Sequence, residues 1–265
     1  MKIHTKHITR YKFSDDVQFG LQQVRKTPKS TRQQNVLSWE TRIKQGKKEL
    51  SYEDHHRNTV ELVSFETGTT ELVIASEGVV ELQDTHGIVG PHQGHAPLWL
   101  YLQSTERTKA GPGCKSLTKA LSSEKALDQL HELSSGIKDA VQYKIGASQP
   151  DWSAEKAISE GVGVCQDHTH IFLACARSMN IPARYVSGYL MLDDRTVQDA
   201  MHAWAEAHVD GLGWVGFDVS NGISPDLRYV RVATGLDYSD AAPISGARIG
   251  GDSETLHVEI SVAQQ

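Results

Sequence analysis

The spacing of the apolar residues changes along this chain, and the change limits what the chain can fold into. Up to about residue 90, short runs such as 36–43, 71–75 and 78–83 resemble strands separated by turn residues. Between 115 and 142, apolar residues recur every three or four positions, which is the period of a helix. A second helical stretch at 165–179 is followed by strand-like runs at 183–192, 200–209 and 214–219. This order predicts an α+β core preceded by an all-β N-terminal module.

Glycine and proline mark the boundary between these parts. Gly-Pro at 90–91, Ala-Pro at 96–97 and Gly-Pro-Gly at 111–113 interrupt regular structure. We therefore predict a β module at 1–85, a connector with helical content at 86–114 and a catalytic core at 115–265. Residues 254–262 alternate and are expected to form a strand. The glycine-rich, acidic segment 237–252 is expected at the surface, either as a solvated excursion or at the border of a cleft.

Charge and cysteine content restrict the partners and the compartment. The 265 residues carry 27 Lys and Arg against 33 Asp and Glu, a net charge of −6, which argues against broad binding of nucleic acids or anionic membranes. Three cysteines imply no disulfide framework and fit a reducing compartment. The N-terminus lacks an apolar leader, and no apolar stretch approaches the roughly 18 residues of a membrane span. We expect a soluble, cytoplasmic protein whose oligomeric state the sequence leaves open.

Cys165 is the candidate nucleophile. It follows a Gly-Val-Gly-Val turn at 161–164 and begins a predicted helix that Asn180-Ile-Pro182 ends. The free N–H groups and the dipole at a helix N-terminus favour a thiolate over a thiol. The alternative is a buried structural cysteine. Cys175 is expected in the core, and Cys114 is expected in a loop without a role.

His202 and Asp218 are the candidate partners of that thiolate. A nucleophilic cysteine needs a base or an imidazolium, which a third group orients. His202 begins an alternating run, and Asp218 ends the next one, 16 residues later. A hairpin of two antiparallel strands would bring the two side chains together. The alternatives are a half-buried strand histidine and a carboxylate at a strand end.

Four motifs in this order resemble the bacterial branch of the transglutaminase-like superfamily: Gly163-Val-Cys-Gln-Asp-His168, Ile181-Pro-Ala-Arg-Tyr-Val-Ser-Gly-Tyr189, His202-Ala-Trp-Ala-Glu206 and Gly213-Trp-Val-Gly-Phe-Asp218. The resemblance is strong over 115–235 and extends to the rest of the chain by overall layout. It implies a papain-like core, with a cysteine on a helix packed against a sheet that bears histidine and aspartate. The family's catalytic residues fall on Cys165, His202 and Asp218.

The chain departs from the family pattern in two places. Asp218-Val-Ser-Asn221 stands where many relatives have Asp-Pro-Thr-Asn, so the loop geometry is expected to differ while the Asp and Asn are kept. The calcium-site sequences and trailing β-sandwich domains of the animal enzymes have no counterpart. Calcium activation is therefore not carried over.

Other groups around these motifs have several interpretations. A metal site formed by Cys165, His168, His170 and His202 is disfavoured, because His170 would point to nearly the opposite side of a helix from His168. Trp204 and Trp214 are expected near or beneath the walls of the cleft. Arg184 and Tyr185 are either scaffold or cleft residues. The backbone N–H of Cys165 is the natural first oxyanion donor, and the second donor stays open among three candidates: Tyr143, Gln149 and Trp152.

These observations favour a cysteine-dependent acyl transfer on amide or peptide bonds through a thioester, with no metal or organic cofactor. The substrate would be a peptide, a protein or a small amide. We favour hydrolysis, because water is the default acceptor in an open cleft. Cross-linking by transamidation uses the same residues and is the first alternative. A catalytically inactive binding module and a metal-binding protein are the alternatives from other classes.

Overall fold

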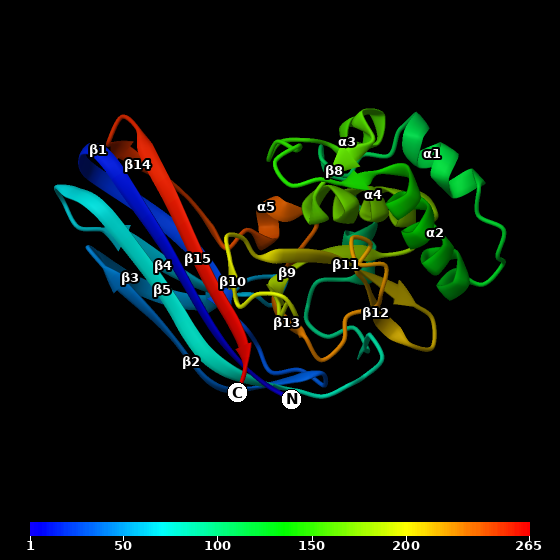
Figure 1. The fold of residues 1–265 in the computed structure, drawn as a ribbon, viewed down its shortest axis with the longest axis horizontal. Helices are drawn as coiled ribbons and strands as arrows, with labels where there is room; N and C mark the ends of the chain where they lie inside the picture. Colours follow the sequence, from blue (N-terminus) through cyan, green and yellow to red (C-terminus); the bar gives the residue numbers. More distant parts are fainter.

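Two sheets lie side by side in the computed structural model, which describes residues 1–265 (Figure 1). The larger sheet has eight strands and contains most of the β module. The smaller has five, and helices α1 to α4 cover one of its faces (Figure 1). The N- and C-termini lie next to each other at one edge of the molecule, because the first and last strands pair.

Strand β1 (Lys2–Thr27) is the spine of the larger sheet. Its first half pairs with β5 (Thr69–Leu82) and β15 (Glu254–Gln264), and its second half pairs with β4 (Thr59–Phe65) and β14 (Ile244–Gly250). The register shifts between Lys12 and Val17, where β1 changes partners. The sheet is extended by β2 (Gln34–Lys44) on β5, by β3 (Gly46–Glu53) on β4 and by β10 (Val197–Gln198) on β15. The strands between residues 1 and 85 confirm the predicted β module.

The range predicted for the core, 115–265, runs too far. The segment 254–262 is a strand as predicted, but β14 and β15 both pair with β1 and belong to the larger sheet. Val258, Ile260 and Val262 pair with Thr9, His7 and Thr5, so they complete the buried face of the first strand. Alternation indicates that a segment is a strand, but it does not identify the partner strand.

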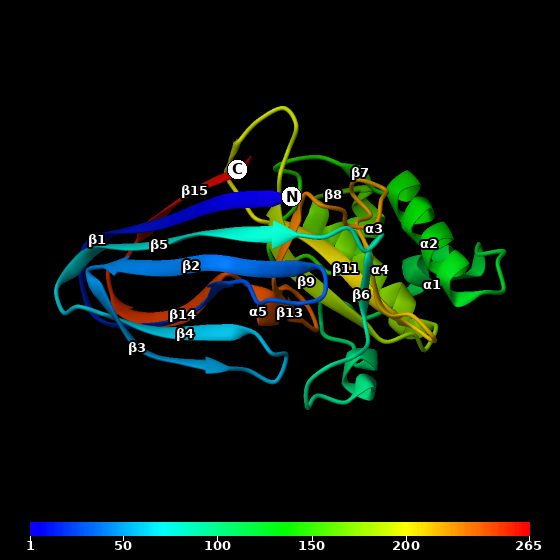
Figure 2. The ribbon, with the colours of Figure 1, turned by 90° about the horizontal axis from the view of Figure 1, so that it is seen from below.

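The smaller sheet is antiparallel, in the order β13–β9–β11–β12–β6. Its members are β9 (Ala183–Leu190), β11 (His202–Val209), β12 (Gly213–Phe217), β13 (Tyr229–Gly235) and β6 (Ile88–Gly90). The first three confirm the strands predicted between 183 and 219. The connector supplies β6 and a 3-10 helix η1 (Leu98–Leu102), so it is part of the core rather than a free link (Figure 2).

Helix α4 (Cys165–Ser178) is the centre of the helical layer, and nearly all of its side chains are buried. It packs against β11, whose small residues Ala203, Ala205 and Ala207 belong to the same core cluster. Around it lie α1 (Pro112–Lys119), α2 (Ala126–Ala140) and α3 (Ala154–Glu160). These helices confirm the helical pattern predicted from 115 to 179. No helix of the chain is both long and apolar enough to cross a membrane.

Cys114 does not lie in a loop, as the sequence suggested, but inside α1. Its thiol is fully buried, and Cys175 donates from Sγ to the carbonyl oxygen of Cys114 at 3.7 Å. Pro112 at the start of α1 and Glu155, which accepts from three backbone N–H groups there, explain why a helix begins at this glycine-rich stretch. Cys175 is in the core as predicted.

Two side-chain amides join the β module to the edge of the smaller sheet. Gln34 donates to the carbonyl of Arg231 at 2.7 Å and accepts from its N–H at 2.8 Å. Asn58 makes the same pair of bonds with Thr234, also at 2.7 and 2.8 Å. Both amides are buried, so they replace a neighbouring strand along β13 and hold the two sheets in a fixed relation.

Candidate active site

Cys165 is the first residue of α4, and its side chain is half-buried. Gly161 ends α3 in the left-handed conformation, with φ 65°. Gly163 follows in the short strand β8 (Val162–Gly163), where a Cβ would lie 2.8 Å from the Cβ of Asp167. Asp167 Oδ2 accepts from the N–H of Val164 at 2.8 Å, which fixes the turn at the helix start. The turn therefore presents the thiol at the positive end of a buried helix.

His202 and Asp218 are in contact, as the predicted hairpin requires. His202 Nε2 lies 2.6 Å from Asp218 Oδ2, and the carboxylate is fully buried. Tyr229 and Asn221 donate to the same oxygen, each at 2.7 Å. Burial alone would raise the pKa of Asp218, but the hydrogen bond and charge of His202, with these two donors, hold it below the ordinary value. Because Nε2 is occupied, Nδ1 is the ring nitrogen left to serve Cys165.

The charge state of His202 follows from its partners. Burial alone would lower its pKa, but the charge of Cys165 and the hydrogen bond to Asp218 raise it to about 10. Nearby rings of Trp204 and Tyr229, with centroids 6.3 and 6.0 Å from the imidazole, enclose it. At neutral pH His202 is therefore an imidazolium.

Cys165 and His202 line one cavity of about 280 Å³ between the two sheets. The core wall includes Tyr185 and Ser187 of β9 and Met201. The opposite wall comes from the larger sheet: His7, Thr9, Tyr11, Ile244, Leu256 and Val258. Tyr238 and Pro243, in and after the short helix α5 (Tyr238–Ala241), complete the border. The segment 237–252 thus contributes to the cleft, and it is structured rather than a loop.

A buried lysine lies behind the wall formed by the larger sheet. Lys26 is fully buried, and its Nζ donates to Thr9 Oγ1 at 2.6 Å. That hydroxyl is 3.1 Å from His7 Nε2, and His7 Nδ1 is 3.1 Å from the hydroxyl of Tyr189 in β9. Burial lowers the pKa of Lys26 to about 7. A chain of polar contacts therefore crosses from the β module to the core beside the cavity.

Tyr143 is one of the three candidates for a second oxyanion donor. It lies in β7 (Gln142–Tyr143), which pairs in parallel with β8, so that Tyr143 is aligned with Gly163. Burial and the charge of Cys165 raise the pKa of Tyr143 to about 12, which keeps its hydroxyl protonated. Gln149 and Trp152 lie in the turn before α3, where the indole ring is 5.8 Å from Lys156 Nζ.

The histidines of α4 do not form a metal site with Cys165. His168 bonds through Nε2 to the carbonyl of Val141 and through Nδ1 to the hydroxyl of Ser220, both at 2.9 Å. His170 is buried elsewhere on the helix, where its Nε2 accepts from the N–H of Tyr238 at 3.3 Å. No three His, Cys, Asp or Glu side chains of the chain gather as metal ligands would. His168 instead supports the helix beside the site.

Of the two tryptophans expected at or beneath the cleft, only Trp204 lies there. Trp204 is buried in a small cluster beneath His202, which fits the expectation that it lies below the cleft. Trp214 was expected there too, but it lies away from this cavity, with the guanidinium of Arg184 3.9 Å from its ring centroid. Arg184 therefore lies outside the cavity of Cys165, whereas its neighbour Tyr185, on the opposite face of β9, lines it.

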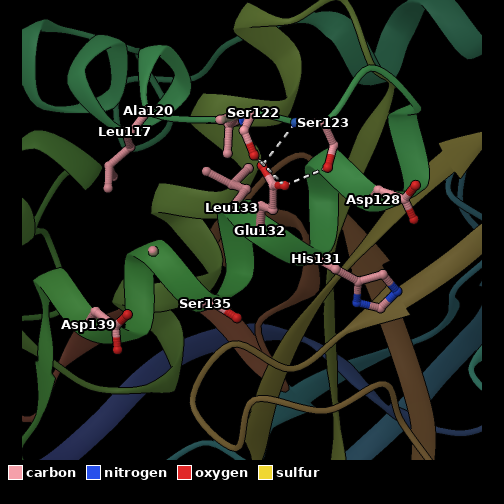
Figure 3. A pocket seen from close by; sticks show the side chains of 12 residues that line it. Leu117, Ala120, Ser122, Ser123, Asp128, His131, Glu132, Leu133, Ser135 and Asp139 are labelled. Atoms are coloured by element: carbon pink, nitrogen blue, oxygen red, sulfur yellow. Dashed lines mark hydrogen bonds between the residues drawn. The ribbon is translucent and has the colours of Figure 1, made fainter.

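A larger cavity elsewhere in the molecule contains none of these groups. It measures about 670 Å³ and lies between α1 and α2. Figure 3 shows Glu132 turned toward Ser122 and Ser123, which donate to it from backbone and side chain. Asp128 and Asp139 lie well apart along the same helix and do not converge (Figure 3). This cavity is consequently part of the link between two helices rather than a reactive site.

Sequence reasoning missed two parts of the site. Tyr229 holds Asp218, yet a single tyrosine at the start of a strand carries no local signal of that role. His7 and Thr9 line the cavity from the β module, and only the pairing of the first and last strands brings them there. The sequence did indicate Asn221, because this residue completes the Asp-x-x-Asn pattern that begins at Asp218.

Comparisons with known proteins agree with this architecture. Residues 115–219 match the transglutaminase-like superfamily, and residues 3–81 match the bacterial transglutaminase-like N-terminal region. An uncharacterized protein of Mycobacterium leprae is 27% identical over 97% of each chain. Another, from Mycobacterium tuberculosis, is 34% identical over 51% of this chain and 46% of its own length.

One solved structure shares the whole fold. The crystal structure of a proposed cysteine protease from Cytophaga hutchinsonii has a TM-score of 0.77 at 23% sequence identity, covering 100% of this chain and 91% of that one. The combination of a β module and a helix-covered sheet therefore recurs as one unit. With both of its parts matched in the same order, the chain belongs to the transglutaminase-like superfamily, in the bacterial branch that carries an N-terminal β region.

Proposed function

We propose that this protein is a cysteine-dependent enzyme that transfers the acyl group of amide or peptide bonds through a thioester on Cys165. The observation that carries the proposal is the shared cavity of Cys165 and His202, with His202 Nε2 held by Asp218. A thiolate at a helix N-terminus, an imidazolium and an orienting carboxylate are the groups that this chemistry needs. Membership in the superfamily supports the same class of reaction.

The reaction proceeds in two halves. The Cys165 thiolate attacks the carbonyl carbon, and the backbone N–H of Cys165 and the hydroxyl of Tyr143 stabilise the oxyanion. His202 then donates the proton from Nδ1 to the departing amine, the C–N bond breaks, and the thioester forms. In the second half, neutral His202 takes a proton from water, which attacks the thioester and releases the acid and the thiolate. Asp218 keeps the imidazole oriented throughout.

Hydrolysis is the outcome that we favour, because water reaches an open cavity without a dedicated site. The substrate is a peptide, a protein or a small amide with an apolar group beside the scissile bond. The apolar wall residues Tyr11, Ile244 and Val258 support the choice of an apolar substrate group. A cavity of about 280 Å³ has room for a side chain or a short acyl group.

Transamidation is the second candidate, and one residue favours it. Asp199 is the single carboxylate among the side chains that line the cavity. An exposed carboxylate beside His202 would attract a cationic primary amine, such as a lysine side chain, to the position from which it attacks the thioester. In this case Asp199 would determine whether water or an amine accepts the acyl group.

The activity test uses a panel of blocked peptides incubated with the full chain, with and without a primary amine, and mass spectrometry of the products. We expect acids from wild type and no product from Cys165→Ala. If amine adducts dominate in wild type and decline selectively in Asp199→Asn, the enzyme is a transamidase. If Cys165→Ala turns over substrate like wild type, the proposed function is wrong.

A second test needs no substrate and distinguishes an enzyme from an inactive binding module. Mild iodoacetamide treatment near pH 6, read by mass spectrometry, should alkylate Cys165, because Cys114 and Cys175 are fully buried. Loss of the imidazolium in His202→Ala should slow this alkylation by roughly tenfold or more. The control His86→Ala removes an exposed histidine, 89% accessible, and should leave the rate unchanged. Equal rates in all three proteins would favour the binding module.

A further inference from the structure

A second cavity of about 300 Å³ lies where the β module meets the edge of the smaller sheet. Its walls come from the loop between β1 and β2, the turn between β3 and β4, and strands β9, β12 and β13. It shares no lining residue with the cavity of Cys165. The proposed function makes no use of it.

This cavity is strongly basic in an acidic protein. Five of its lining residues are cations: Lys29, Arg32, Arg57, Arg184 and Arg231. No aspartate or glutamate lines it, although the chain as a whole has a net charge of −6. Positive charge is therefore concentrated at one place by the fold rather than by composition.

The floor of the cavity contains two guanidinium groups that share one carboxylate. Glu206 is fully buried on β11 and accepts from Arg184 Nε at 2.6 Å and from Arg231 Nε at 2.7 Å. Two positive charges against one negative charge leave an excess of one. Arg184 is 7% exposed and stacks on Trp214, and it lines the cavity together with Arg231. An anion in the cavity would balance the excess positive charge of these two guanidinium groups.

The residues at the rim of this cavity also carry more positive than negative charge. Lys29 and Arg57 share a single carboxylate, that of Glu53. Arg32 is exposed and has no ion-pair partner in the chain. Floor and rim together thus present three more cations than carboxylates toward one small volume.

We propose that this cavity binds a small molecule through a phosphate group. A phosphate offers several oxygens in different directions, and the planar fork of a guanidinium can hold two of them at once. A volume of about 300 Å³ is at the lower end for ligand pockets and suits a small phosphorylated compound better than a folded partner. Arg184 and Arg231 hold the phosphate from below, and Arg32 closes on it from the rim.

The test is a titration of the full chain with inorganic pyrophosphate at about 0.15 M salt, followed by calorimetry and by phosphorus NMR. Arg32→Gln removes the unpaired rim cation and should weaken binding roughly ten- to hundredfold, the size expected for one charge-assisted hydrogen bond. Arg42→Gln is the matched control, because Arg42 is 74% exposed, pairs with Glu40 and lies outside the cavity. It should leave the affinity unchanged.

Two further measurements keep the proposal open to failure. Arg184→Lys retains the charge but loses the fork, so it should also weaken binding; if this variant does not fold, Lys29→Gln takes its place as the second cavity variant. No binding by wild type, or equal weakening in Arg32→Gln and Arg42→Gln, would overturn the proposal. Tighter binding of a hexaglutamate peptide than of pyrophosphate would overturn it in favour of an acidic protein segment.

Discussion

A buried base belongs to each side of the Cys165 cavity, His202 on the core side and Lys26 behind the module side, and the pKa values of the two are shifted in opposite directions. On the core side, His202 has Asp218 and Cys165 as partners, and its pKa rises to about 10. Behind the module side, Lys26 has only the hydroxyl of Thr9 and the carbonyl of Ile74 as acceptors, and its pKa falls to about 7. Burial opposes charge at both positions, so the partners decide the charge state.

The difference indicates what each wall contributes. On the core wall, Asp218 and Cys165 flank His202, which is the arrangement that the proposed proton transfer to a substrate needs. The module wall surrounds its base with neutral groups and leaves a lysine that gains or loses its proton near neutral pH. Substitutions that remove His202 and its partners, or Lys26, test the two sides one at a time.

The largest effect is expected from the core wall. Cys165→Ala and His202→Ala should each lower turnover roughly 10⁴–10⁶-fold, because nucleophile and acid act as one unit. Cys165→Ser should also be very poor, because a hydroxyl does not form the ion pair with histidine. Asp218→Asn should keep the fold and lower the rate by up to roughly 10⁴-fold. Initial rates on the best peptide of the panel measure all four.

The control for these variants is Cys114→Ala, because Cys114 lies in α1 and lines none of the three described cavities. It should retain turnover, which would separate loss of the nucleophile from loss of a thiol in general. A wild-type rate in His202→Ala would exclude the proposed acid.

Local sequence was sufficient to predict that Cys165 begins a helix and that His202 and Asp218 meet across a hairpin. The glycine turn before Cys165 and the alternation around His202 are features of neighbouring residues, and the hairpin that joins His202 to Asp218 spans only 16 positions. Side-chain periodicity also placed the helices and strands of the core. The face that each side chain occupies was harder to predict, as Trp214 shows, since a buried aromatic residue fits either face of an inner strand.

The module wall could not be predicted from local patterns. His7 and Thr9 reach the cavity because β1 pairs with β15 from the other end of the chain, where Ile3 lies opposite Gln264. Alternation makes both segments strands but leaves their pairing undetermined. For the same reason Lys26 could be read only as an ordinary charged residue until its partners were known.

The next largest effect concerns the oxyanion. Tyr143→Phe removes the hydroxyl while retaining the ring, and it should lower kcat roughly 10²-fold with little change in KM. Tyr52→Phe is the control, because Tyr52 is similarly exposed but lies on β3 of the larger sheet, whereas Tyr143 lies next to the strand that precedes Cys165. A wild-type kcat in Tyr143→Phe would transfer the role to Gln149 or Trp152.

A substitution of Lys26 should change the stability of the protein more than its catalytic rate. Lys26→Met replaces a buried ammonium that lacks a carboxylate partner by an apolar side chain of similar length. Near pH 6 the variant should be more stable than wild type by roughly 1–3 kcal/mol in urea unfolding. Lys47→Met is the control, because Lys47 is 72% exposed, and it should have no measurable effect. A less stable Lys26→Met would mean that the polar contacts to Thr9 and His7 outweigh the burial of charge.

The last prediction concerns the pH dependence of stability, to which His202 and Lys26 contribute with opposite signs. The pKa of His202 is raised to about 10 from an unfolded value of about 6.5, so its stabilisation is complete below pH 6.5 and is lost as pH rises through 10. The pKa of Lys26 is lowered to about 7 from about 10.4, so its penalty is complete below pH 7 and disappears toward pH 10.4. The two slopes therefore oppose each other between about pH 7 and 10.

Wild type should consequently show a nearly flat free energy of unfolding across this range. In Lys26→Met only the histidine contribution remains, so stability should fall by about 1.4 kcal/mol per pH unit at the steepest point. In His202→Ala the lysine contribution remains, and stability should rise with pH by a similar amount. Urea unfolding at pH 7, 8 and 9 measures both slopes. Parallel curves for the two variants would show that neither base has the charge state that its partners imply.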